Sequence, residues 1–292
     1  MEKIDKIVFG DNQFFGINHR SQEKAEEMLK RFSDVHNILK VYNDAFDCGV
    51  RAVMLNSNDR AEEICQYFRD HKSQYGDLVW YPSVPYPHKY ANMVNELGIL
   101  PAINEVLFKG NSVGGMLSMI GKGASAVFTK DAMKMMDMLL DVEFKIFRGL
   151  NVNTFFLLNP ITDLLLGYNV KEWFEHYCEY VRKKYNCNPG LITLNMPYLK
   201  SKLEEWGIDE VVICSSVNAA GFNMHPSKEA YEKAIAENDQ TKYQLMAMNV
   251  LASGSISVWE SFDYINSLNL QSVVFGASSK GHIQSSIDSI KI

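Results

Sequence analysis

The sequence is poor in the features that mark secreted, disulfide-linked and membrane proteins. Its five cysteines are scattered, odd in number and without a Cys-x-x-Cys pair, so we expect neither a disulfide framework nor a zinc knuckle. The longest apolar run, residues 154–168, is interrupted by polar residues and is shorter than the roughly 20 residues that a membrane span needs. The first residues are charged and unlike a signal peptide, so we expect a cytoplasmic protein.

Clusters of basic residues are also missing. The chain has 29 Lys and Arg against 35 Asp and Glu, a net charge of −6, and no basic block. Nucleic acids and anionic membranes are bound through clustered Lys and Arg, so neither partner is expected. The predicted partner is a small-molecule substrate, and the oligomeric state stays open.

Short apolar runs alternate with amphipathic helical segments along the chain. The runs are almost continuously hydrophobic, which is typical of parallel strands that are covered on both faces. Eight such strands with covering helices predict an α/β fold, a (β/α)8 TIM barrel forming a single domain over residues 1–292; an open doubly wound sheet is the alternative. The predicted strands are 6–10, 51–56, 78–84, 153–159, 190–195, 210–215, 243–250 and 272–276.

One segment exceeds the barrel plan. Residues 86–152 are too many for a single strand-to-helix connection. The segment is punctuated by glycine and then becomes rich in methionine, a residue that fills irregular cores. We therefore predict a helical insertion after the third strand, forming a cap beside or over the barrel mouth.

Amides and hydroxyls crowd the positions that follow the predicted strands. In barrels the chemical groups lie there, on the strand-to-helix loops. Any single Asn or Ser of this kind also fits a helix cap or a turn, but the whole set predicts a polyhydroxylated or phosphorylated ligand. The residues predicted to bind substrate are Asn56, Arg60, Tyr86, Asn159, Asn195 and Asn218.

Small residues after the last two strands predict a phosphate- or cofactor-binding site. Such residues let backbone N–H groups approach an anion, and a helix N-terminus favours negative charge. Ordinary tight turns before helices are the alternative interpretation. The predicted residues are Ser253, Gly254, Gly276, Ala277, Ser278, Ser279 and Lys280.

Several of these segments resemble the aldo-keto reductases, and the resemblance extends from the second to the eighth strand outside the insertion. It implies a TIM barrel that reduces carbonyl compounds with NADPH. The segments that carry it are 45–51 with 55–57, 156–160, 251–254, and 274–279 with 282–283.

The catalytic tetrad that the resemblance implies is not found at its expected positions. The Asp, Lys and His positions correspond to Asn56, the vicinity of Ser83, and Asn159, and no Tyr occurs in the loop 58–60. Without the Asp and Lys, no group lowers the pKa of a Tyr, so the usual proton donor is lost. The chain thus resembles a diverged member of the family. Because Lys280 is the only basic residue at the 2′-phosphate position, NADPH stays possible and the cofactor unknown.

Titratable residues near strand ends are the candidate replacements. Asp11 follows the first strand directly, and His88 with Lys89 follows the third, so these three are the predicted catalytic residues. Asp11 also has a structural interpretation, as the cap of its own turn. No metal is predicted, because His19 and His225 do not complete a metal-ligand spacing with them.

Three functions fit these observations. The first is a non-redox isomerase or lyase that acts by acid/base chemistry on a small sugar-like or phosphorylated metabolite. The second is an NAD(P)H-dependent oxidoreductase with a rearranged proton donor, Tyr86 or His88. The third is a non-catalytic ligand-binding barrel.

Overall fold

Parallel strands form a sheet that closes on itself. The computed structural model describes residues 1–15, 22–86 and 130–292. In the sheet β2 pairs with both β1 and β3, which joins the two ends of the strand order and closes the barrel. The strands are β1 (Ile7–Phe9), β2 (Ala52–Asn56), β3 (Val79–Val84), β4 (Asn151–Val152), β5 (Thr154–Leu157), β6 (Asn188–Thr193), β7 (Val211–Ser216), β8 (Tyr243–Met248) and β9 (Ser272–Phe275).

The segments β4 and β5 are two parts of one barrel strand. Both pair with β3, and only Asn153 separates them. The barrel therefore has the eight parallel strands that the sequence predicts, and the open-sheet alternative is excluded. Of the predicted insertion, residues 87–129 lie outside the described residues.

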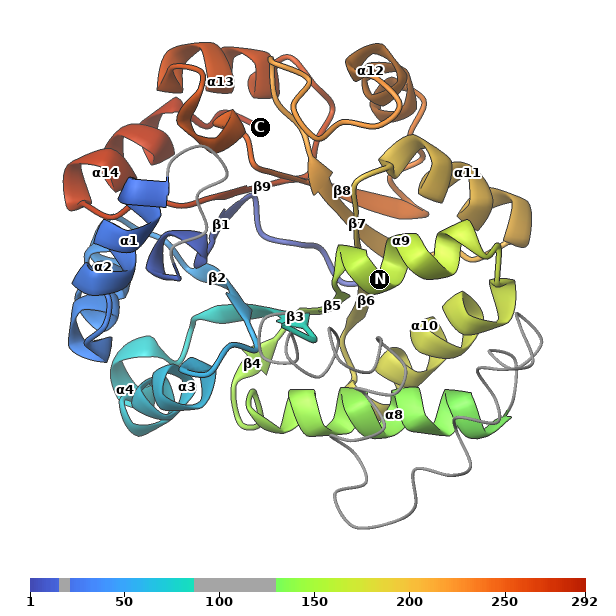
Figure 1. Cartoon of the computed structure of the whole chain (residues 1–292), viewed down its shortest axis with the longest axis horizontal. Coiled ribbons are helices and arrows are strands. Elements are labelled where there is room, and N and C mark those ends of the chain that lie inside the picture. The colour runs from blue at the N-terminus through green and yellow to red at the C-terminus, as the bar shows by residue number, and fades with distance from the viewer. Residues whose placement is uncertain (16–21, 87–129) are drawn as a thin grey trace.

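Helices surround the barrel as an outer ring (Figure 1). Several begin at side-chain caps, for example α2 at Asp34 and α13 at Ser257, whose oxygens accept backbone N–H groups of the first turn. Among the described residues, no helix has both the length and the apolar character to cross a membrane. The helices are α1 (Gln22–Arg31), α2 (Val35–Asp47), α3 (Ala61–Asp70), α4 (Lys72–Tyr75), α8 (Lys130–Lys145), α9 (Asn159–Gly167), α10 (Lys171–Tyr185), α11 (Met196–Trp206), α12 (Lys228–Ala236), α13 (Val258–Asn266) and α14 (Lys280–Ser289), with short 3-10 helices η1 (Asn12–Phe14) and η4 (Ala252–Gly254).

Apolar side chains form two cores, because successive residues of a strand point to opposite faces. Val8 belongs to the inner core, inside the barrel, and its neighbour Phe9 packs outward beneath the helices. Both are fully buried. This explains why the strands read as continuous hydrophobic runs in the sequence.

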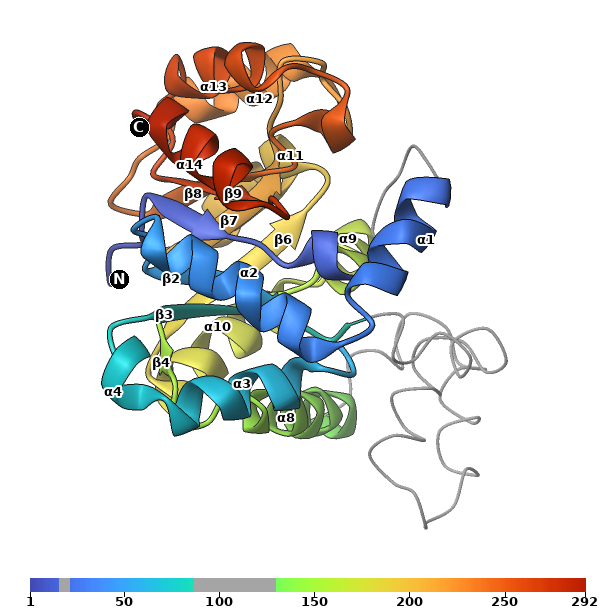
Figure 2. The same ribbon diagram turned by 90° about the vertical axis from the view of Figure 1, so that its left-hand side faces the viewer.

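The N-terminal segment Glu2–Asp5, called here the bottom plug, closes one end of the barrel. Gln244 accepts the Ile4 N–H at 2.9 Å and donates to the Glu2 carbonyl at 2.7 Å, and the Tyr81 hydroxyl accepts the Asp5 N–H at 2.8 Å. Figure 2 places the N-terminus at the end of the barrel opposite α1 and α9. The other end, where the strands finish, remains as the mouth.

Candidate active site at the barrel mouth

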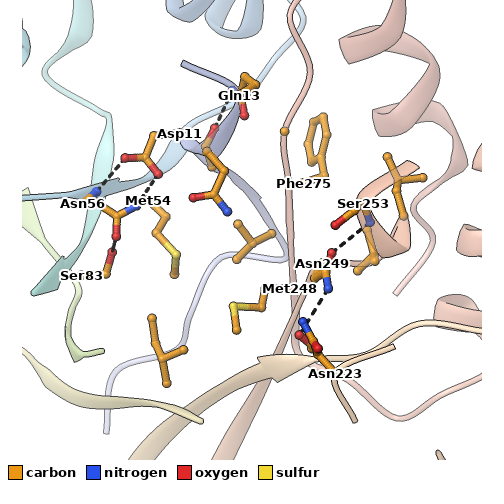
Figure 3. A pocket seen from close by; sticks show the side chains of 18 of the residues that line it. Asp11, Gln13, Met54, Asn56, Ser83, Asn223, Met248, Asn249, Ser253 and Phe275 are labelled. Carbon is orange, nitrogen blue, oxygen red and sulfur yellow. Dashed lines mark hydrogen bonds between the residues drawn. The ribbon is translucent and has the colours of Figure 1, made fainter. Parts of the chain in front are cut away.

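A cavity of about 550 Å³ lies at the carboxyl ends of the strands. Its walls come from the carboxyl-terminal parts of the strands and from the segments that follow them, so residues far apart in the sequence share one space. Its polar lining residues are Asp11, Asn12, Gln13, Asn56, Ser83, Tyr86, Asn159, Ser216, Asn223, Asn249 and Ser253. Figure 3 shows Asp11, Asn56 and Ser83 on one wall and Asn223, Asn249 and Ser253 on the other.

Asp11 lies at the junction of the first three strands. Its Oδ2 accepts the backbone N–H of Asn56 and its Oδ1 accepts the Asn56 side-chain Nδ2, each at 2.8 Å. The Asn56 Oδ1 in turn accepts the Ser83 hydroxyl at 2.9 Å. Because Asn56 and Ser83 are paired in register at the ends of β2 and β3, backbone geometry fixes this chain of hydrogen bonds.

Burial raises the pKa of Asp11 from its ordinary value of 3.8 to about 7. Only 2% of the residue is exposed, and a carboxylate loses its hydration when it is removed from water. The two N–H groups of Asn56 act in the opposite direction and lower the pKa. Near neutral pH, Asp11 can therefore both donate and accept a proton, as a general acid/base must.

Two phenols surround this carboxyl group. Burial, followed by the charges of Asp11 and Asp59, raises the pKa of Tyr86 to about 12, so this lining residue is neutral at pH 7. The hydroxyl of Tyr42, on α2, is buried without a hydrogen-bond partner among the described residues. Burial and then the charge of Asp11 raise the pKa of Tyr42 well above its usual range. Neither phenol is an activated proton donor.

The opposite wall is built from residues with left-handed backbone conformations. Asn249 has φ 53° and Ser253 has φ 57°, and the Asn249 Oδ1 accepts the Ser253 N–H at 3.2 Å. Gly254 has φ +79°, and a Cβ at this position would meet no atom within 4 Å. The exit of β8 thus leaves open space beside its backbone, which a ligand can occupy.

Three of the predicted substrate-binding residues lie outside the cavity lining, and the side chains of two of them, Asn195 and Asn218, are held in structural hydrogen bonds. The Asn195 side chain caps α11 by accepting the Tyr198 N–H. Asn218 pins its own loop by bonding both the N–H and the carbonyl of Phe222. Arg60 is the residue before α3, and none of these three lines the cavity. Asn56, Tyr86 and Asn159 do line it.

The predicted phosphate-binding residues are divided by the structure. Ser253, Gly254 and Gly276 line the cavity, whereas 277–280 lie beyond it. Lys280 turns toward α2, where its Nζ forms an ion pair with Asp47 at 2.8 Å.

Among the described lining residues, the cavity has an acidic side chain, Asp11, but no basic one. Within the described part of the chain, no Lys, Arg or His side chain lines it. The predicted catalytic residues His88 and Lys89 lie outside the described residues, as does His19. Of the predicted catalytic set, the structure therefore places Asp11 alone.

Several lining residues were not predicted as site residues. Asn12 and Gln13 follow Asp11 directly, and their place after a strand was the available signal. Gln13 donates to the Gly10 carbonyl at 2.7 Å, and a Cβ on Gly276 would lie 2.2 Å from its Oε1. Glycine at position 276 thus makes room for Gln13. Asn249 carried the same signal, because it lies at the end of a predicted strand.

Comparison with known proteins gives a fold but no sequence relative. The sequence matches no protein-family model and no curated protein. Three solved structures are representative: an aldo-keto reductase of the silkworm Bombyx mori complexed with NADPH (TM-score 0.58, 14% identity, 100% of this chain and 81% of that chain covered); a second from Bombyx mori in complex with NADP (0.54, 11%, 99% and 85%); and the aldose reductase of Schistosoma japonicum (0.51, 11%, 100% and 85%). The chain has the aldo-keto reductase fold, which confirms the resemblance found in the sequence.

Proposed function

We propose that this chain is an oxidoreductase that interconverts a carbonyl group and an alcohol in a small polar compound, with Asp11 exchanging the proton. The observation that carries the proposal is the buried Asp11 carboxyl group, whose pKa is about 7 and which lines the cavity at the barrel mouth. In this proposal Asp11, from the first strand, takes the place of the tyrosine donor that the fold relatives lead one to expect.

The number of titratable groups favours carbonyl reduction. Adding hydrogen across a carbonyl group needs a single proton donor, whereas sugar isomerisation needs a base for a C–H bond and acid/base groups for two oxygens. In the described part of the cavity the titratable side chains are Asp11 and Tyr86, and the pKa of Tyr86 is raised. Among the described lining residues one acid has a pKa near neutrality, and one acid is enough for reduction.

The exits of β8 and β9 would hold the cofactor. Ser253, Gly254 and Gly276 line the same cavity as Asp11, and the space beside Gly254 is open. Solved structures with this fold contain NADPH or NADP. A nicotinamide dinucleotide, when bound, would supply the hydride.

The residues of this chain then have distinct roles. In reduction, the neutral Asp11 donates its proton to the carbonyl oxygen of the substrate, and the resulting carboxylate is stabilised by the two N–H groups of Asn56. The amides of Asn159 and Asn249 are placed to hydrogen-bond hydroxyl groups. The amide and hydroxyl groups that line the described part of the cavity suit a polyhydroxylated substrate.

A second candidate is the non-redox acid/base enzyme. One observation favours it: Lys280, the basic residue expected at the 2′-phosphate position, lies beyond the cavity and forms an ion pair with Asp47 on α2. In that case Asp11 would work with His88 and Lys89 as the further acid/base groups.

The deciding experiment is cofactor binding followed by turnover. NADPH and NADH are titrated into the protein by calorimetry, and the oxidation of the bound cofactor is then followed with a panel of small hydroxyaldehydes and hydroxyketones. We expect micromolar binding of at least one dinucleotide. We also expect kcat/KM to fall about 10²–10⁴-fold in Asp11→Asn.

The matched control is Asp5→Asn, an aspartate at the opposite end of the barrel that accepts the Tyr81 hydroxyl. It should reduce carbonyls like the wild type. Absence of dinucleotide binding would reject the oxidoreductase. Turnover without dinucleotide that is lost in His88→Ala or Lys89→Ala would establish the second candidate instead.

A further inference from the structure

Asn56 contacts both carboxyl oxygens of Asp11 and so limits where the acid proton can lie. Its backbone and side-chain N–H groups occupy both carboxyl oxygens from the side of β2, each at 2.8 Å. A proton on neutral Asp11 must then use a lone pair that faces away from Asn56. Asp11 also lines the cavity, where a substrate oxygen would receive the proton in the proposed reaction.

Ser83 determines which end of the Asn56 amide meets the carboxyl group. An amide presents a donor at one end and an acceptor at the other. The Ser83 hydroxyl donates to the Asn56 Oδ1 at 2.9 Å, so the Nδ2 is directed toward Asp11. The reverse orientation would place the amide oxygen against the carboxylate, and the two partial negative charges would repel each other.

The three residues belong to three adjacent strands, which makes the arrangement rigid. The register pairs Asn56 with Ser83 across β2 and β3, and β1, which Asp11 follows, pairs with the other side of β2. Among the described residues, the other titratable groups facing Asp11 are the phenols of Tyr42 and Tyr86. Both phenols have raised pKa values and are neutral near pH 7, and the hydrogen bonds of the described residues to the Asp11 carboxyl oxygens include the two from Asn56.

We propose that Asn56 is the positioning residue for the Asp11 proton donor and that Ser83 acts only through Asn56, as the group that orients its amide. This inference rests on the proposed function, because it concerns the same carboxyl group. It goes further by assigning roles to two residues that do not react and by predicting that their effects are not additive.

The experiment measures the titration of Asp11 itself. Carboxyl ¹³C resonances are followed against pH, and the Asp11 signal is identified by its loss in Asp11→Asn. Loss of one N–H donor makes the carboxylate less favourable, so Asn56→Ala should raise the titration midpoint by about one pH unit. Ser83→Ala should raise it by a smaller amount, and Asn56→Ala/Ser83→Ala should match Asn56→Ala alone.

Two further variants make the result decisive. Ser83→Thr keeps a hydroxyl and should restore the wild-type midpoint, and this variant also serves if Asn56→Ala does not fold. Ser272→Ala removes another buried strand hydroxyl, one without a hydrogen-bond partner among the described residues, and should leave the midpoint unchanged.

The possible outcomes separate this inference from the proposed function. An unchanged midpoint in Ser83→Ala, or shifts that add in the double variant, overturns the role of Ser83. Correct shifts in a protein that reduces no carbonyl would support the positioning role and overturn the oxidoreductase. Where turnover is present, the alkaline limb of kcat/KM for reduction should move with the midpoint in every variant.

Discussion

At the scale of single residues, burial and hydrogen bonding have opposite effects on the pKa of Asp11 at the barrel mouth. An aspartate with 2% exposure and no described cation beside it is held by amide N–H groups alone. These donors offset part of the lost hydration, and burial prevails, so the pKa settles at about 7. The same balance that suits a proton donor costs folding stability whenever the group is ionised.

This cost predicts a specific pH dependence of stability. Below pH 3.8 Asp11 is protonated in both the folded and the unfolded chain. Between pH 3.8 and about 7 Asp11 ionises only in the unfolded chain, so the free energy of unfolding falls as pH rises. Above about pH 7 the group is ionised in both states and this decline ends. The interval corresponds to on the order of 4 kcal/mol. Urea unfolding from pH 4.5 to 8 should therefore show the wild type losing stability relative to Asp11→Asn, and parallel curves for the two proteins would contradict the raised pKa.

Asp11→Asn is a suitable reference because the hydrogen-bond network can reverse. An Asn at position 11 can accept the Asn56 backbone N–H and donate to the Asn56 Oδ1, if the Asn56 amide turns and donates to the Ser83 oxygen. A hydroxyl both donates and accepts, so all three residues keep their partners. The comparison then isolates the charge.

At the scale of elements, close packing across the barrel interior fixes where small residues are required. Gly190 of β6 is paired in register with Phe156 of β5. A Cβ at Gly190 would lie 2.3 Å from the Phe156 Cδ1, far inside contact distance. The glycine therefore lets a large aromatic side chain fill the inner core.

Gly190→Ala should consequently destabilise the barrel by about 1–3 kcal/mol through overpacking. Gly167→Ala, at the end of α9, is the control, because its added Cβ would meet no atom within 4 Å. Denaturant midpoints at constant slope would measure both variants. Equal stability of the two variants would show that Phe156 moves aside without cost.

At the scale of the whole molecule, the two ends of the barrel are made unlike each other. The bottom plug fills one end, where its backbone is hydrogen-bonded to the Gln244 side chain and the side chain of Ile4 is buried. Polar side chains with a cavity between them occupy the other end. The residues that close the barrel and the residues that line the cavity therefore lie at opposite ends, as is general for TIM barrels.

This separation predicts that Ile4→Ala weakens the fold without altering the site. Ile4 belongs to the inner core and is 8% exposed, so its truncation should cost about 2–5 kcal/mol in urea unfolding. The titration midpoint of Asp11 should stay at its wild-type value. Lys3→Ala, an exposed neighbour, should change neither quantity. A shifted midpoint in Ile4→Ala would mean that the two ends are coupled.

The sequence alone was sufficient for the fold and for the position of Asp11. Strands covered on both faces are read as uninterrupted apolar runs, and the predicted runs coincide with the observed strands. Asp11 was recognisable because a carboxyl group directly after a strand must lie at the mouth. The roles of Asn195 and Asn218 were not recognisable, because the same amide serves a helix cap, a loop or a ligand equally well.

Only the tertiary structure decided the chemistry of the mouth. Asp11 and Asn56 are 45 residues apart, and Lys280 meets Asp47 across 233, so no local pattern could reveal either pair. Hydrophobic periodicity is a property of neighbouring residues, so it can be read directly from the sequence. A pKa is a property of everything that surrounds a group after folding, and for Asp11 that surrounding exists only when the barrel has closed.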